Sequence, residues 1–174
     1  AASPPAVSPG GRWLALEVWS ATGNTILSRL VVQPTTGGPA WSMLVPADLP
    51  TWVGFSGDER YAFYALSGPD TAGEQHSRLM SVPVPDGAGG PDVGAIRPLI
   101  DHRLPAPSWL GNVALTPDGR HLLALLTPMQ TSAVPGAATQ GPGLYALRPD
   151  GADWQLLASQ AIEFWVAAGQ PWAV

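Results

Sequence analysis

The chain has 174 residues, enough for one domain of ordinary size, and 45% of them are hydrophobic, enough for an apolar core. Its eight basic residues are all arginines, dispersed along the chain, and the net charge is −5. This excludes nucleic acid as an expected partner, because phosphates require basic patches. With no cysteine, disulfides and thiolate metal sites are excluded. No apolar run approaches the length of about 18 residues that a membrane helix needs, so no membrane insertion is expected.

Along the chain, a short motif occurs three times: a hydroxyl residue, a three-residue turn, an arginine, and then an aromatic or apolar strand. The copies begin at Ser8, Ser56 and Thr116, with Arg12, Arg60 and Arg120 four residues after them. In the third copy the turn is Pro-Asp-Gly, a sequence that favours tight turns because each residue presets or tolerates the required backbone angles. We expect at least two of the three arginines to bond neighbouring turn carbonyls or Asp side chains and so to stiffen the hairpin.

A second motif runs in phase with the first, an aromatic strand that contains Trp52, Trp109 and Trp165, spaced 57 and 56 residues apart. The second half of each unit is an apolar strand, a Gly-containing turn and another apolar strand, as in Leu144–Leu147, Pro149–Gly151 and Trp154–Leu157. No segment of helical length shows a 3.6-residue period. Each unit is therefore predicted to be four short strands.

Four-stranded sheets that repeat about an axis are typical of propellers. We predict an all-β fold of propeller-type blades in a single domain over residues 1–174, with three four-stranded antiparallel repeats at about 8–50, 51–107 and 108–163. Residues 164–174 are predicted to be the first strand of a further blade. A β-sandwich with accidental similarity between its hairpins is the alternative.

The Ser/Thr-Pro-Asp-Gly-Arg strand start, with the later Leu-Tyr-x-x-x-Pro-Asp-Gly and closing Leu-Leu strand, resembles the PD-type (WD-like) repeats of TolB-like β-propellers. The match is closest over residues 116–158, fair over 8–45 and loosest over 56–100, where Gly57-Asp58-Glu59 replaces Pro-Asp-Gly. The resemblance implies a propeller and a protein-interaction, sensor or capping role. It departs from the family in blade count, since closed propellers carry four to eight blades and three are visible.

The first unit lacks a Trp-containing first strand, while Trp165–Ala168 is a first strand without a following blade. Both ends are thus expected to be open edges, which invite pairing with another chain. We expect either a homodimer that closes a six-bladed ring or a portion of a longer propeller.

Few residues have the pattern of a catalytic site. Asp101-His102-Arg103 is the densest charged cluster, and it is interpreted as a polar loop that can bind a partner, with a general acid–base pair as the alternative. His76 is expected in a solvated loop, and His121, which aligns with Trp13 and Tyr61, is expected to pack along a strand. No catalytic residue, metal ligand set or cofactor site is predicted. The turn carboxylates repeat, which favours a structural role, with calcium binding as the alternative.

Two tryptophans without counterparts in the other units, Trp19 and Trp172, are candidate binding platforms, whereas the repeated ones are expected to pack structurally. We expect recognition at the end of the blades that carries residues 67–77, 101–108 and 127–142, because loops that vary in length over a repeated scaffold usually bind.

The sequence therefore predicts a non-enzymatic binding or scaffolding module that contacts a protein partner or acts in sensing. A carbohydrate- or small-ligand-binding propeller is the alternative, followed by a hydrolase or lyase. The small-residue, Pro-rich start at Ala1–Pro5 is typical of the mature end of an exported protein or of a linker, and it favours an extracytoplasmic location, periplasmic or at the cell surface.

Overall fold

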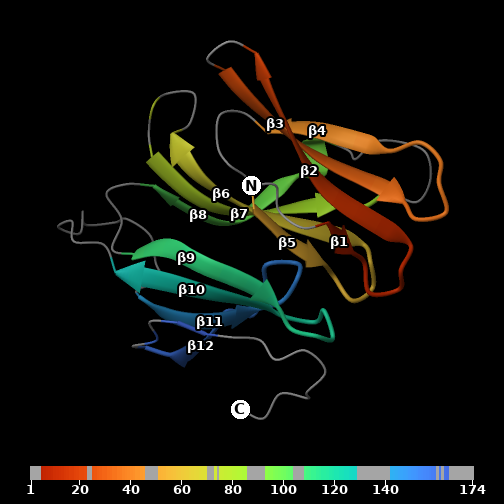
Figure 1. The fold of residues 1–174 in the computed structure, drawn as a ribbon. Coiled ribbons are helices and arrows are strands. Elements are labelled where there is room, and N and C mark those ends of the chain that lie inside the picture. Colours follow the sequence, from red (N-terminus) through yellow and green to blue (C-terminus); the bar gives the residue numbers. More distant parts are fainter. Residues whose placement is uncertain are drawn as a thin grey trace.

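The computed structural model describes residues 5–22, 25–45, 51–69, 73, 75–85, 93–103, 108–128, 142–159, 161 and 163–164. Within these ranges the chain forms three four-stranded antiparallel sheets, one short 3-10 turn and no α-helix (Figure 1). The prediction of an all-β fold built from three four-stranded antiparallel repeats is confirmed. The sheets are consistent with propeller-like blades, and the described residues close no ring.

Each sheet is a meander, in which consecutive strands pair in chain order. The first sheet contains β1 (Ala6–Val7), β2 (Trp13–Thr22), β3 (Thr25–Pro34) and β4 (Trp41–Val45). The second contains β5 (Thr51–Phe55), β6 (Tyr61–Pro69), β7 (Gln75–Pro83) and β8 (Arg97–Arg103), with the 3-10 turn η1 (Val93–Ala95) before β8. The third contains β9 (Ser108–Leu115), β10 (Leu122–Pro128), β11 (Gly143–Leu147) and β12 (Gln155–Ala158).

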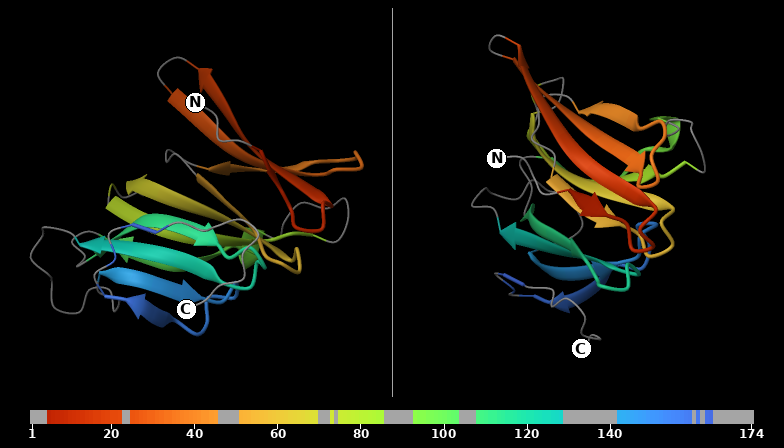
Figure 2. Two further views of the ribbon diagram at one scale, coloured as in Figure 1. Left: turned by 60° about the horizontal axis from the view of Figure 1, so that its bottom comes forward. Right: turned by 45° about the vertical axis from the view of Figure 1, so that its right-hand side comes forward.

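The three sheets follow one another in space as they do in sequence, with the second between the first and the third (Figures 1 and 2). Their first strands are neighbours, since β5 contacts both β1 and β9. The last strands lie at the other edges of the sheets, and every described side chain of β12 is exposed. Successive sheets thus meet along their first strands, as blades do around a propeller axis.

The second sheet is covered on both faces because alternate residues of a strand point to opposite sides. Ala62, Tyr64 and Leu66 of β6 belong to a buried cluster shared with the first sheet, which includes Leu30 and Trp41. Phe63, between them in sequence, is fully buried in a second cluster shared with the third sheet, which includes Leu122, Leu126 and Leu147. Burial of this apolar surface is the main driving force for stacking the sheets.

The repeated Trp-Val-Gly and Trp-Leu-Gly segments of the first strands each carry a break in register. Val53 is skipped in the pairing of β5 with β6, and Gly111 is skipped in the pairing of β9 with β10. Bulges of this kind increase twist and re-aim backbone groups. Beside the second bulge, the Leu110 N–H donates to the Oγ of Ser77 in the second sheet at 3.1 Å, a polar tie between sheets.

Two expectations about strands are corrected by the structure. The first-strand position of the first sheet is occupied, because Ala6 and Val7 pair with Ala15 and Leu14. Residues 75–77, expected in a loop, begin β7 and pair with the end of β6. Among the described residues, no helix is long and apolar enough to cross a membrane.

Candidate functional site at the turn end of the sheets

The three copies of the turn motif share one hydrogen-bond pattern. In each, the backbone N–H of the fourth residue donates 2.8 Å to the carbonyl of the opening hydroxyl residue. The side-chain oxygen of that hydroxyl residue accepts the N–H of the sixth residue at 3.0 Å. The fourth residue has a positive φ in all three copies: Gly11 at 72°, Glu59 at 58° and Gly119 at 64°. Glycine suits this conformation because it has no Cβ, so Glu59 occupies a strained position.

A carboxylate at the third position completes the turn in the second and third copies. Ser56 and Thr116 each donate from the hydroxyl to the following Asp58 or Asp118 at 2.6 Å, and the backbone N–H two residues on donates to the same carboxylate. Hydrogen bonds from Thr116 and from the Arg120 N–H hold the pKa of Asp118 below its usual value. Burial raises the pKa of Asp58, but the equivalent bonds outweigh it and the net shift is downward.

The first copy has Gly10 at this position and therefore no carboxylate of its own. Glu59 of the second sheet replaces it, accepting from the Ser8 hydroxyl at 2.5 Å and from the Gly10 N–H at 2.7 Å. Arg12 also pairs with this carboxylate, whose side chain is 5% exposed. A Cβ at position 10 would lie 2.8 Å from the Glu59 Oε1, so the site has room for one carboxylate only.

Gly57 joins the second turn to the third. Its N–H donates to the Gly119 carbonyl at 3.0 Å, and a Cβ on it would collide with the carbonyl oxygen of Asp118. Proline, which stands here in the other two copies as Pro9 and Pro117, has no N–H and would not fit. The two residues that depart from Pro-Asp-Gly in the second copy are therefore the two that contact the neighbouring turns.

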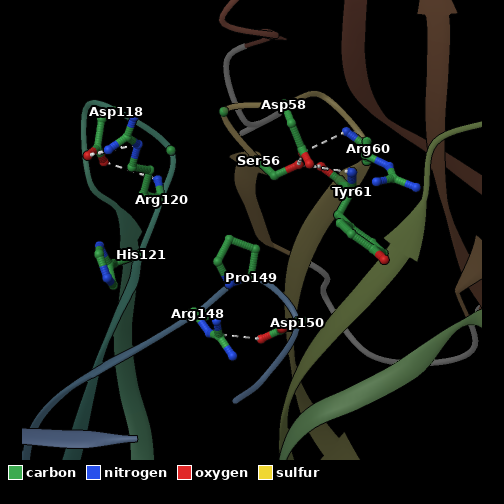
Figure 3. A pocket seen from close by; sticks show the side chains of 12 residues that line it. Ser56, Asp58, Arg60, Tyr61, Asp118, Arg120, His121, Arg148, Pro149 and Asp150 are labelled. Carbon is green, nitrogen blue, oxygen red and sulfur yellow. Dashed lines mark hydrogen bonds and ion pairs between the residues drawn. The ribbon is translucent and has the colours of Figure 1, made fainter. Parts of the chain in front are cut away.

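A cavity of about 780 Å³ lies where the second turn, the third turn and the β11–β12 turn meet. Figure 3 shows the three turns around it. The side chains along its wall include three arginines, two aromatic or imidazole rings and the turn carboxylates; they are Asp58, Arg60, Tyr61, Asp118, Arg120, His121, Arg148 and Asp150.

The carboxylates around this cavity already have partners within the protein. Asp58 and Asp118 hold their own turns, and the Oδ1 of Asp150 accepts the Ala152 N–H at 3.0 Å. Arg148 pairs with Asp153 at 2.9 Å. By contrast, Arg60 and Arg120 are exposed, and Arg120 lies 3.9 Å from Asp118 with 79% of its side chain accessible. The cavity therefore presents guanidinium and ring surfaces to a ligand more than it presents acid–base groups.

The expectation that at least two of the motif arginines bond neighbouring turn carbonyls or Asp side chains and stiffen the hairpin is only partly met. The Arg12 side chain bonds Glu59 of the next sheet. The Arg120 side chain makes a long, exposed contact with Asp118, and exposed pairs of this kind contribute little to stability. Of the motif arginines, Arg12 is the one whose side chain stabilises the fold, through its contact with Glu59.

The Asp101-His102-Arg103 cluster lies in strand β8, where it pairs with Arg78, Ser77 and His76 of β7, and so the interpretation as a loop is corrected. Asp101 is exposed, and its Oδ1 lies 2.7 Å from the Nδ1 of His76. His76 is 2% exposed, in contrast to the solvated loop residue expected. The side chains of His102 and Arg103 lie outside the described part of the structure.

His121 is exposed and lines the cavity, so the prediction that it packs along a strand is wrong. Trp109 is partly buried in β9. Trp19 lies in β2, but its side chain is outside the described residues, as are Trp165 and Trp172 entirely. The cavity was not predicted, because its lining residues have the pattern of turn formers. The repeated arginine was the signal in the sequence that could have indicated it.

No group of three or more His, Cys, Asp or Glu side chains among the described residues is placed to hold a metal ion. In comparisons with known proteins, no family model matches the chain, and no curated protein matches it in sequence.

Exchanging the carboxylate between turns tests the role of Glu59. We expect Gly10→Asp to destabilise the protein, because two carboxylates would compete for one site. Glu59→Gly should cost about 1–3 kcal/mol, because Ser8 and Arg12 lose their acceptor. The double variant restores an Asp-Gly turn in both copies. Its loss of unfolding free energy should be smaller than the sum of the two single losses by at least about 1 kcal/mol. Urea unfolding of the four proteins measures this coupling, and additive losses would contradict the assignment.

Acid should weaken the same contact. Burial raises the pKa of Glu59, but bonds from Ser8, Arg12 and the Gly10 N–H outweigh it and lower the pKa overall. A carboxylate with a lowered folded-state pKa stabilises the protein above its unfolded-state pKa, and that stabilisation disappears as the pH falls through the folded-state value. We expect the unfolding free energy to fall below about pH 4, where glutamate in an unfolded chain titrates, and to fall less steeply in Glu59→Gln. Parallel pH profiles of the two proteins would count against this interpretation.

Proposed function

We propose that the chain is a non-enzymatic binding module of the TolB-like propeller type, and that it contacts a protein partner through the cavity at the turn end. The observation that carries the proposal is the pairing of repeat-equivalent residues around one cavity: Arg60 with Arg120, and Tyr61 with His121. Arginine and tyrosine are enriched among the residues that dominate the energy of protein interfaces. Repetition gives the surface two similar contact units side by side.

The partner surface that fits is acidic. The exposed guanidinium groups of Arg60 and Arg120 can each donate to a carboxylate, and charge-assisted bonds of this kind are among the stronger hydrogen bonds. Asp58 and Asp118 partly neutralise these arginines, so the proposal requires a peptide that offers several carboxylates rather than a single anion. An acidic segment of a partner protein meets this requirement.

General acid catalysis at this cavity is disfavoured by the ionisation state of its carboxyl groups. The lowered pKa values of Asp58 and Asp118 keep both carboxylates ionised near neutral pH, where a general acid must hold a proton. Their hydrogen bonds also fix them in the turns. The His76–Asp101 pair does not line this cavity, and the histidine is buried. The residues around this cavity therefore do not favour a hydrolase or lyase. The extracytoplasmic location stays a prediction.

A carbohydrate-binding propeller would be supported by unpaired aromatic platforms around a cleft. Trp154, which lies next to the third sheet's last turn, packs edge-on against Tyr145 with ring centroids 5.6 Å apart. Tyr145 belongs to a buried cluster, and Trp154 is partly buried against that cluster. No described tryptophan lines the turn-end cavity. We therefore favour a protein partner.

Fluorescence anisotropy with labelled peptides tests the proposal. We expect a Glu/Asp-rich peptide to bind more tightly than a Lys/Arg-rich peptide of equal length, and its binding to weaken as salt rises. Arg60→Ala and Arg120→Ala should each reduce affinity at least about fivefold, the scale of one charge-assisted hydrogen bond. Arg29→Ala, an exposed arginine on the first sheet away from the cavity, is the matched control and should bind normally.

Two results would contradict the proposal. One is an affinity for the acidic peptide that both arginine variants leave unchanged. The other is a binding activity that survives these substitutions and is lost when residues 127–142 are shortened to a tight turn. The second result would place recognition at the opposite end of the blades, as the loop lengths predict.

A further inference from the structure

The first sheet lies at one end of the row of three sheets (Figure 2), and its outer face, which points away from the second sheet, is apolar and open. Ala15 and Leu30 are buried in the cluster shared with the second sheet, so their neighbours in each strand point outward. On this outer face Val18, Leu44 and Val7 are 45%, 50% and 60% exposed. They are three of the five large hydrophobic side chains that are exposed in the described part of the chain. A concentration of this kind marks an interaction surface.

The repeat indicates which kind of element this face receives. The outward residues of β2 correspond, by their place in the motif, to residues of the other two sheets: Leu14, Leu16 and Val18 correspond to Ala62, Tyr64 and Leu66 of β6 and to Leu122, Ala124 and Leu126 of β10. In β6 and β10 these residues are buried, because the preceding sheet packs on them. A sheet with apolar side chains is therefore the element that fits the outer face.

A second copy of the chain has one such face to offer. The far side of the third sheet, at the other end of the row, is closed within the chain, since Leu123 and Leu125 are each 4% exposed. The two remaining exposed hydrophobic side chains, Leu156 and Leu157, lie in the short edge strand β12. Within the described structure, the outer face of the first sheet is thus matched by the same face of another copy.

The outer face also has the symmetry that a contact between two copies requires. Its cross-strand pairs run in order along β2 and β3: Leu14 with Gln33, Leu16 with Val31, and Val18 with Arg29. A two-fold axis between the copies, running across the strands at the middle pair, lays β3 antiparallel on β3. Arg29 of one copy then lies over Gln33 of the other, whose amide oxygen can accept from the guanidinium, and the two Arg29 side chains stay apart.

We propose that the outer face of the first sheet binds the same face of a second copy of this chain, with β3 antiparallel to β3 across the contact. A contact of this isologous kind uses both faces and stops at two copies. With a rise of about 3.3 Å per residue and about 4.8 Å between strands, the face covers roughly 400 Å². Two copies bury about 800 Å² in total, the size of weak and transient interfaces, so the dimer should require concentrations above about 10 μM.

Sedimentation equilibrium between about 5 and 500 μM tests the proposal. We expect the mass to rise from one chain to two and to stop there. Val18→Lys places a charge in the contact and should raise the dissociation constant at least about tenfold. Lysine is used because Arg29, opposite Val18 in the same sheet, would pair with a carboxylate. Leu156→Lys is the matched control, since Leu156 is 50% exposed in the third sheet, and it should dimerise like the unmodified protein.

Substitutions at Gln33 test the antiparallel register. Within one copy Arg29 and Gln33 are four residues apart in an extended strand, about 13 Å, so a charge at position 33 acts on Arg29 across the contact. Gln33→Glu should lower the dissociation constant about threefold, and Gln33→Arg should raise it by a similar factor. The gain from Gln33→Glu should disappear when Arg29→Ala is added.

Several results would overturn the proposal. One is a mass of one chain at every concentration, and another is an assembly that grows beyond two copies. A third is a Val18→Lys protein that dimerises as tightly as Leu156→Lys. A Gln33→Glu dimer that is no tighter than the unmodified one would also overturn it, because the β3 strands would then not meet in the antiparallel register. Melting temperatures at about 2 μM, below the expected dissociation constant, should be alike for the two lysine variants, which separates loss of the contact from loss of the fold.

Discussion

The fold depends on the position of the second sheet, which lies between the other two and shares a buried apolar cluster with each. Phe63 and Tyr64, adjacent in sequence, belong to two different buried clusters because a strand alternates its side chains. A sheet in this position must be apolar on both sides and must also match the backbone of two neighbours at its turn. Gly57 and Glu59 meet the second requirement, one through a backbone hydrogen bond and the other through a carboxylate.

This constraint explains why the second turn departs from the repeat and why exposed arginines line the cavity. A turn that satisfies its own hydroxyl and N–H groups with an aspartate leaves the next arginine free to point outward, as Arg60 and Arg120 do. In the first copy the arginine is instead used to hold Glu59. Whether the motif arginine pairs with a carboxylate of the neighbouring sheet thus depends on which residue stands at the third position of the turn, glycine or aspartate.

Much of the architecture could be predicted because its signals are local and repeated. Pro-Asp-Gly sets a turn by backbone preference, and the Trp-x-Gly segments mark the first strands. The strand Ala6–Val7 carries no such signal, since it is positioned by pairing with β2 and by packing beside β5. The His76–Asp101 contact joins residues on neighbouring strands, and polar residues around His76 had suggested a loop. Likewise, the alignment with Trp13 and Tyr61 fixed the position of His121 in the motif but not its exposure.

Amide hydrogen exchange, followed residue by residue, tests the central claim most directly. Amides in regions with fewer buried contacts exchange through local opening, and those in the most buried region exchange through global unfolding. The account predicts the slowest exchange in β6, from Ala62 to Leu66, and faster exchange in β2, where Leu14 and Leu16 are partly buried and Val18 is exposed. If β2 exchanged as slowly as β6, the second sheet would not be the element on which the others depend.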